Sequence, residues 1–319
     1  MDTALIVSDK HQEMEASRPS LSSQVAQFLA EQDISEASKA TYTRNLRQFV
    51  SWLEQTGRMS HLRKLQRDDI LAFKESLQAS GKSAYTISGY LTTVRKCFEW
   101  LEAKKLYPNV ARNIKGAKRP RGFRKDCLSE EQLRHVISST NASGLEGARD
   151  FALFNLVART GLRTIEVARA TVADIRRESS QPVLWIQGKG RDSKDDFVVL
   201  TEKAETPIQV YLSMRKASEG RLSPEAPLFC SHSDRNAGQA LTTRSISRLI
   251  KEALKRAGLD DSRLTAHSLR HTAISLSIKG GASLQQAQAM ARHTDPKTTL
   301  VYFHNLARVK DGAEKYIQF

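Results

Sequence analysis

The sequence predicts a mainly α-helical protein with one small β-sheet, an α+β chain of two domains. Its 319 residues are more than a single typical core organises, which favours two domains. Apolar residues recur at helical spacing along most of the chain. Only two short runs, 182–187 and 196–200, look like strands, and the glycine-containing turn 188–192 between them predicts a hairpin.

The first predicted domain, residues 21–106, contains helices only. In each of four stretches, apolar side chains lie three or four residues apart and therefore share one helical face. The expected helices are 21–31, 35–55, 68–79 and 83–104. Residues 1–20 precede them as a flexible tail, because their apolar patch is too short for a signal peptide.

The segment between the domains, residues 107–126, is predicted to be a basic linker. From Lys104 to Lys125 the chain holds nine Lys or Arg and no acid, and Pro and Gly interrupt any continuous helix. Such unopposed charge suits a phosphate backbone, although an ordinary solvated linker is the alternative. The cations predicted to contact DNA are Arg112, Lys115, Lys118, Arg119, Arg121, Arg124 and Lys125.

The second predicted domain, residues 127–319, combines helices with the small sheet and ends in a C-terminal tail. Ser129 and the acids that follow it have the pattern of a capped helix N-terminus. The expected helices are 130–139, 146–160, 203–218, 244–257, 267–279, 283–291 and 296–307.

The composition indicates a polyanionic partner. Lys and Arg outnumber Asp and Glu by 50 to 35, and the net charge of +15 favours nucleic acid over a membrane surface. A basic protein with a solvated surface is the alternative. Cys97, Cys127 and Cys230 are too far apart for a disulfide framework or a zinc knuckle, which favours a reducing cytosol. No apolar run approaches the ~18 residues that a membrane span requires.

Two residues of the second domain stand at positions where glycine breaks the regular structure. Arg163 follows Gly161 and has Glu166 three residues further on, a spacing that allows an ion pair. Lys189 lies between two glycines at the hairpin tip. Each feature alone is also typical of an ordinary surface, as an Arg–Glu pair or a solvated lysine.

The last three expected helices carry imidazoles, a guanidinium and a phenol. His267, Arg270 and His271 share a helical face. We interpret His271 as a packing or capping residue and leave it out of the predicted site. His293 ends the next helix, and Tyr302 follows nine residues later in the last one. Taken alone, that tyrosine is more often a core residue than a nucleophile.

Taken together, four spaced motifs resemble the tyrosine recombinase family, also called the phage integrase or Xer-like family. The motifs are T-G-L-R-x-x-E (160–166), G-K-G (188–190), H-x-L-R-H-T (267–272) and H-x₈-Y (293–302). Their order, intervals and context all match, from about residue 128 to 303, and the helical half resembles the family's SAM-like core-binding domain. The resemblance implies two domains that form a C-shaped clamp on DNA.

The resemblance also implies a role for each motif residue. Arg163 and Arg270 would bind the oxygens of the scissile phosphate with paired hydrogen bonds, and His293 would add a third donor. Tyr302 would attack phosphorus and form a 3′-phosphotyrosine. His267 would accept the proton of the tyrosine, and Lys189 would give a proton to the leaving group. Glu166 would support the first arginine.

This chemistry implies an enzyme without cofactors. A phosphotyrosine keeps the energy of the broken phosphodiester, so rejoining needs neither ATP nor metal. The sequence accordingly shows no phosphate-binding loop, no paired carboxylates for magnesium and no Cys/His metal cluster.

One position departs from the family pattern. The family usually has Leu-Gly before the histidine of the last motif, where this chain has Ala291 and Arg292. The loss of glycine predicts either a different turn into His293 or an Arg292 that contacts DNA.

The expected partner is double-stranded DNA with specific core sites, bound in the cytoplasm at the bacterial nucleoid by a homotetramer on two sites. The segment 308–319 is expected to dock into a neighbouring protomer, and a DNA-bending or directionality protein is a further possible partner. We favour integration, excision or resolution of a mobile element or replicon over Xer-type dimer resolution. The rival functions are a type IB topoisomerase and a non-catalytic DNA-binding protein.

Overall fold

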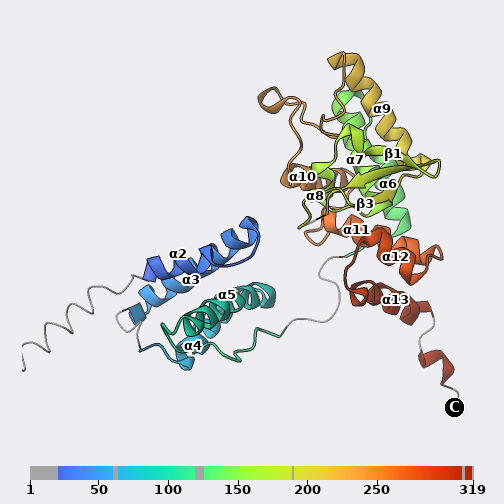
Figure 1. The fold of residues 1–319 in the computed structure, drawn as a ribbon. Coiled ribbons are helices and arrows are strands. Elements are labelled where there is room, and N and C mark those ends of the chain that lie inside the picture. Colours follow the sequence, from blue (N-terminus) through green and yellow to red (C-terminus); the bar gives the residue numbers. More distant parts are fainter. Residues whose placement is uncertain (1–20, 60–63, 119–125, 189, 311–312, 318–319) are drawn as a thin grey trace, which may run out of the picture. The chain divides into compact units, whose positions relative to one another are not determined.

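A computed structural model describes residues 21–59, 64–118, 126–188, 190–310 and 313–317. The chain divides into two compact units, Met1–Arg121 and Gly122–Phe319, and each unit has its own hydrophobic core (Figure 1). The division falls within the segment 107–126 that the sequence indicates as a linker. The predicted tail, residues 1–20, lies outside the described residues.

The first unit contains the four predicted helices. They are α2 (Leu21–Ala30), α3 (Glu36–Gln55), α4 (Arg67–Ala79) and α5 (Ala84–Ala103). Ser35 and Ser83 cap α3 and α5, because each hydroxyl accepts a hydrogen bond from the backbone N–H three residues on. The apolar faces meet in a core rich in aromatic rings, where Phe49 and Phe73 pack edge to face with centroids 4.9 Å apart.

The second unit contains a three-stranded antiparallel sheet. Its strands are β1 (Ile175–Glu178), β2 (Gln181–Ile186) and β3 (Asp196–Val199), in the order β1-β2-β3. Leu184 pairs with Ile175 on one side and Val198 on the other. The sequence predicts β2 and β3 but not β1, since Ile-Arg-Arg-Glu has no apolar alternation and three of its residues are exposed.

Apart from this sheet the regular structure of the unit is helical, which makes the unit mainly α-helical, as predicted. The helices of this unit are α6 (Glu130–Ser139), α7 (Gly144–Thr160), α8 (Thr164–Arg169), α9 (Glu202–Glu219), α10 (Thr243–Arg256), α11 (Ala266–Lys279), α12 (Leu284–Ala291) and α13 (Pro296–Lys310). Three short 3₁₀ helices, η2 (Val172–Asp174), η3 (Asp234–Asn236) and η4 (Ala313–Tyr316), complete it. The six-residue α8 is too short to show a helical period in the sequence.

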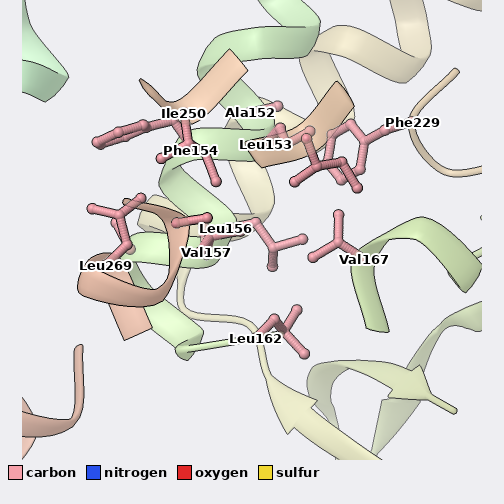
Figure 2. Packing of buried hydrophobic residues seen from close by; sticks show 14 of the residues in the cluster. Ala152, Leu153, Phe154, Leu156, Val157, Leu162, Val167, Phe229, Ile250 and Leu269 are labelled. Carbon is pink, nitrogen blue, oxygen red and sulfur yellow. The ribbon is translucent and has the colours of Figure 1, made fainter. Parts of the chain in front are cut away.

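Helix α7 is the centre of the main core. Its side chains Leu153, Leu156 and Val157 are buried and meet Ile250 of α10 and Leu269 of α11 in one cluster (Figure 2). Because so many of its apolar side chains are buried, α7 is fixed in position. The position of its C-terminus beside α11 is therefore fixed as well.

The C-terminus of α7 turns the chain at a glycine. Gly161 caps the helix in the left-handed conformation, with φ at 62°, which glycine adopts without steric cost. Leu162 then enters the core, and Arg163 begins α8.

A second, smaller apolar cluster holds the last helices. Ile274 of α11, Ala291 of α12 and Tyr302 of α13 are buried together, and the three helices lie side by side in Figure 1. The main core and this small cluster therefore meet at α11.

The first unit's core predicts a matched pair of stability effects. Leu91 is fully buried, so Leu91→Ala is expected to lower the free energy of unfolding by about 2–5 kcal/mol. Leu106 is 45% exposed, so Leu106→Ala is expected to cost under about 0.5 kcal/mol. Urea unfolding followed by tryptophan fluorescence measures both, because Trp52 and Trp100 lie in this core. Equal losses in the two variants would contradict the packing described here.

Candidate active site

Segments far apart in sequence place the predicted catalytic residues around α11. The α7–α8 junction supplies Arg163, α11 supplies His267 and Arg270, and the α12–α13 region supplies His293 and Tyr302. Lys189, the predicted leaving-group acid, lies outside the described residues.

Arg163 is fixed by a buried carboxylate. The Glu166 side chain closes a capping box on α8: its Oε2 accepts from the Arg163 backbone N–H at 2.7 Å, and its Oε1 from the guanidinium at 2.9 Å. Burial alone would raise the pKa of the fully buried Glu166, but the charge of Arg292 and hydrogen bonds from Arg163 and Arg292 hold it below its usual range. Glu166 therefore stays ionised, and the predicted Arg163–Glu166 pair is present.

Arg270 lies deeper than Arg163. It is 2% exposed and donates to the carbonyl of Gly161 at 2.6 Å and to the carbonyl of Ala291. Burial, together with the charges of Arg163 and Arg292, lowers the pKa of Arg270 to about 9. The guanidinium is still charged at neutral pH, so two cationic donors, Arg163 and Arg270, face the same region.

His293 follows the α12–α13 turn and is held from both sides. Its Nδ1 forms a 2.9 Å hydrogen bond with the hydroxyl of Thr299, and its carbonyl accepts from Gln288 at 3.0 Å. Burial and the neighbouring arginines lower the pKa of His293 to about 4, so the ring is neutral at pH 7.

Tyr302 is a buried residue whose hydroxyl meets a histidine. It is 3% exposed, its ring stacks against His293 with centroids 6.4 Å apart, and its hydroxyl is hydrogen-bonded to Nδ1 of His271. Burial raises the pKa of Tyr302, against the opposing charge of Arg270. Burial, His267 and Arg270 lower the pKa of His271 to about 4, so a neutral imidazole faces a neutral phenol.

The structure places His271, which the sequence predicts as a packing or capping residue outside the site, against the predicted nucleophile. His267, the predicted proton acceptor, is exposed and stands edge-on to the His271 ring, with centroids 4.5 Å apart. His271 lies one helical turn further on and contacts the tyrosine. The i, i+4 spacing of the two histidines was a signal that both belong to this face.

Arg292 retains the turn that the missing glycine would make. It caps α12 in the left-handed conformation, with φ at 51° and ψ at 48°, a region that costs a non-glycine residue about 1–2 kcal/mol. Its side chain is 6% exposed and pairs with Glu166 at 2.9 Å. The Arg292 guanidinium is therefore buried against a carboxylate, and its predicted contact with DNA stays a prediction.

The two arginines open onto a groove of about 600 Å³. Arg163, Arg270 and His267 line it, together with Ser247 and Lys251 of α10. Tyr302 is not among the residues that line the groove and is buried among α11, α12 and α13. The groove thus offers guanidinium donors to an anion at its floor.

The predicted DNA-contacting cations are placed only in part. Arg112 forms an ion pair with Glu102 at 2.6 Å, and Lys115 and Lys118 are exposed. Arg119, Arg121, Arg124 and Lys125 lie outside the described residues. In the ranges that the structure describes, no helix is long and apolar enough to cross a membrane.

Outside the groove's lining, the fold brings Glu219 of α9 to Cys230 and His232, which are two residues apart. The three side chains offer possible metal ligands within 4.8 Å of one another, a cluster that the sequence does not predict. Arg215, however, donates to both oxygens of Glu219 at 3.0 and 3.1 Å. The carboxylate is already neutralised by an internal cation.

Comparison with known proteins matches both units. The phage integrase family matches residues 126–308, and its N-terminal SAM-like domain matches residues 25–105. Tyrosine recombinase XerD of Listeria monocytogenes serotype 4b (strain F2365) is 27% identical over 292 residues, which cover 91% of this chain and 95% of XerD.

Solved structures show the same fold. The XerH site-specific recombinase bound to its difH substrate has a TM-score of 0.69 and 21% identity, over 88% of this chain and 80% of XerH. The λ integrase tetramer bound to a Holliday junction has a TM-score of 0.64 and 17% identity, over 90% of this chain and 78% of that one.

The neutral histidines predict a loss of stability in mild acid. His271 and His293 bind protons near pH 4 in the folded chain but near their ordinary pKa of 6.5 when it unfolds. The unfolded state therefore binds more protons between these values, and stability falls as the pH is lowered from about 6.5 to 4. His293→Asn removes one of the two groups and is expected to make thermal unfolding less pH-dependent over this window. His135→Asn, at an exposed site on α6, is the control, and an unchanged slope in His293→Asn would contradict the assignment.

Proposed function

The chain belongs to the phage integrase family, and on that premise we propose that it is a site-specific recombinase whose nucleophile is Tyr302. It cuts one strand of duplex DNA through a 3′-phosphotyrosine and rejoins it to another end, with no cofactor. The observation that carries this proposal is the convergence of two guanidiniums and His293 beside the buried Tyr302.

Arg163 and Arg270 are suited to stabilising the transition state of this reaction. Negative charge builds on the non-bridging oxygens of the phosphate during attack, and charge-assisted hydrogen bonds strengthen as it builds. Both arginines are positioned by internal hydrogen bonds, so little reorganisation is needed when the phosphate arrives. His293, steadied by Thr299, is the third donor, through the ring nitrogen that Thr299 does not occupy.

We propose His271 as the acceptor of the tyrosine proton and His267 as a residue of the groove. A neutral His271 with an unprotonated Nδ1 accepts the hydrogen of the Tyr302 hydroxyl and thereby favours the phenolate as attack begins. His267 is exposed in the groove and is suited to contact the phosphate directly. Lys189 remains the proposed acid for the leaving 5′-oxygen, and Glu166 the support of Arg163.

The proposed substrate is double-stranded DNA carrying specific core sites, bound by four protomers on two sites. XerH with its difH substrate and the λ integrase tetramer on a Holliday junction are DNA complexes of proteins with this fold. The basic segment, with exposed Lys115 and Lys118, would add contacts to phosphates. An accessory DNA-bending or directionality protein, and docking of 308–319 into a neighbour, remain proposals.

Two biological roles are compatible with this chemistry. The sequence favours a role in the integration, excision or resolution of a mobile element or replicon, in the cytoplasm. The similarity to XerD over nine-tenths of the chain favours the second candidate, Xer-type resolution of dimers. A core site adjoining the gene would identify the mobile-element role, and a site near the replication terminus would identify the Xer-type role.

Tyr302→Phe is expected to abolish covalent capture of DNA. A nicked suicide substrate loses the attacking strand after cleavage, so the wild-type chain accumulates as a covalent adduct visible in denaturing gels. The variant lacks the nucleophilic oxygen, so the amount of covalent adduct should fall by at least about 10³-fold. An adduct that survives in Tyr302→Phe would contradict the assignment of Tyr302 as the nucleophile. Efficient relaxation of a supercoiled plasmid without a core site would favour a topoisomerase.

His271→Ala and His267→Ala are expected to differ in how they slow cleavage. Loss of a positioned proton acceptor lowers the rate by about 10²–10⁴-fold, so His271→Ala should reduce the single-turnover rate at saturating DNA by that factor. His267→Ala should raise the DNA concentration needed for half-maximal rate. The opposite pattern, with the larger rate defect in His267→Ala, would return the acceptor role to His267.

A further inference from the structure

Arg292 stands out because a residue in a strained backbone position is also buried and paired. Its φ of 51° lies in the region that favours glycine, and its guanidinium donates to the Met290 carbonyl at 2.6 Å. The same guanidinium donates to both oxygens of Glu166, at 2.9 and 3.4 Å. An arginine held in a strained conformation persists where its side-chain contacts compensate the strain.

Glu166 is shared between two guanidiniums. Arg163 donates to its Oε1 through the side chain and to its Oε2 through the backbone N–H, while the Arg292 guanidinium donates to both oxygens of the fully buried carboxylate. One negative charge therefore serves two positive charges, so Glu166 does not fully neutralise Arg163. Without Arg292, Arg163 would be the one guanidinium of this pair left on Glu166, and the whole carboxylate charge would compete with an incoming phosphate for it.

Backbone carbonyls of the turn that carries Arg292 also accept hydrogen bonds from the two arginines that line the groove. Arg270 donates to the Ala291 carbonyl, and Arg163 donates to the Arg292 carbonyl at 3.3 Å. A phosphate oxygen is charged and is a stronger acceptor than a carbonyl, so substrate competes for both donors. When those donors turn to the phosphate, the Arg292–Glu166 pair still fastens the turn that leads into His293.

We propose that Arg292 is a positioning residue. Its ion pair with Glu166, here called the latch, holds the α12–α13 turn against α8. The latch keeps Arg163 available to the phosphate and His293 in place. This rests on the proposed function, since it assigns Arg292 to the same reaction. Arg292 is buried against Glu166 and is not among the residues that line the groove. Its loss should therefore slow the chemical step at saturating DNA and leave DNA affinity unchanged.

The test uses the full chain and Arg292→Gly, which suits the left-handed backbone but removes the latch. Ser179→Gly is the matched control, because Ser179 is also a non-glycine residue at positive φ, 49°, and is exposed between β1 and β2. We expect Arg292→Gly to lower the single-turnover rate on the suicide substrate about ten- to a hundredfold. Its DNA dissociation constant should stay within twofold of wild type, and Ser179→Gly should cleave at the wild-type rate.

A cycle with Glu166→Gln separates a latch from general structural support. If Arg292 acts through the Glu166 carboxylate, Arg292→Gly adds less than about threefold to the defect of Glu166→Gln. Arg292→Lys should recover part of the rate, since it restores the charge but only one point of contact. It also keeps the test possible should Arg292→Gly fold poorly, which its melting temperature reports.

Three outcomes would overturn the proposal. They are a wild-type cleavage rate in Arg292→Gly, a loss of DNA affinity with an unchanged saturating rate, and multiplicative defects in the double variant. The proposed function fails in a different way, with no covalent adduct from the wild-type chain.

Discussion

The buried Glu166 carboxylate is the constraint on which the site depends. Arg163, Arg270 and Arg292 bring three positive charges into a half-buried region, where like charges repel more strongly than in water. Glu166 is fully buried, ionised and bonded to two of them, so it offsets this repulsion from inside the fold. It also caps α8 through the Arg163 backbone, which ties the position of the first guanidinium to the start of a helix.

The same cations decide the protonation of the histidines. His271 and His293 lie among arginines in partly buried surroundings, and both factors disfavour a further positive charge. The site at neutral pH therefore combines permanent guanidinium charges with neutral imidazoles. This division suits phosphoryl transfer, because the arginines bind the anion while a neutral imidazole can still accept a proton.

Periodicity and spacing predicted most of the helices and supplied the residues proposed for the site, but not their contacts. The helical runs are read from local pattern, whereas β1 escaped because a four-residue polar strand has none. The choice between His267 and His271 depends on where α13 packs on α11, which no local pattern records. Arg292 meets a carboxylate 126 residues earlier in the chain, so only the folded structure shows that an arginine can replace glycine there.

Tyr302 is both a buried core residue and the proposed nucleophile. Among the side chains that the structure describes, it packs with the fully buried Ile274 and Ala291 in a cluster smaller than the core around α7. The remaining attachments of the α12–α13 turn to Arg163 and Arg270 are hydrogen bonds to carbonyls, the acceptors that a phosphate displaces. The Arg292–Glu166 ion pair is a further attachment of this turn, and it joins two side chains that are both buried. The raised pKa of Tyr302 follows from its burial in the same place, so the site holds a neutral phenol whose hydroxyl is bonded to His271.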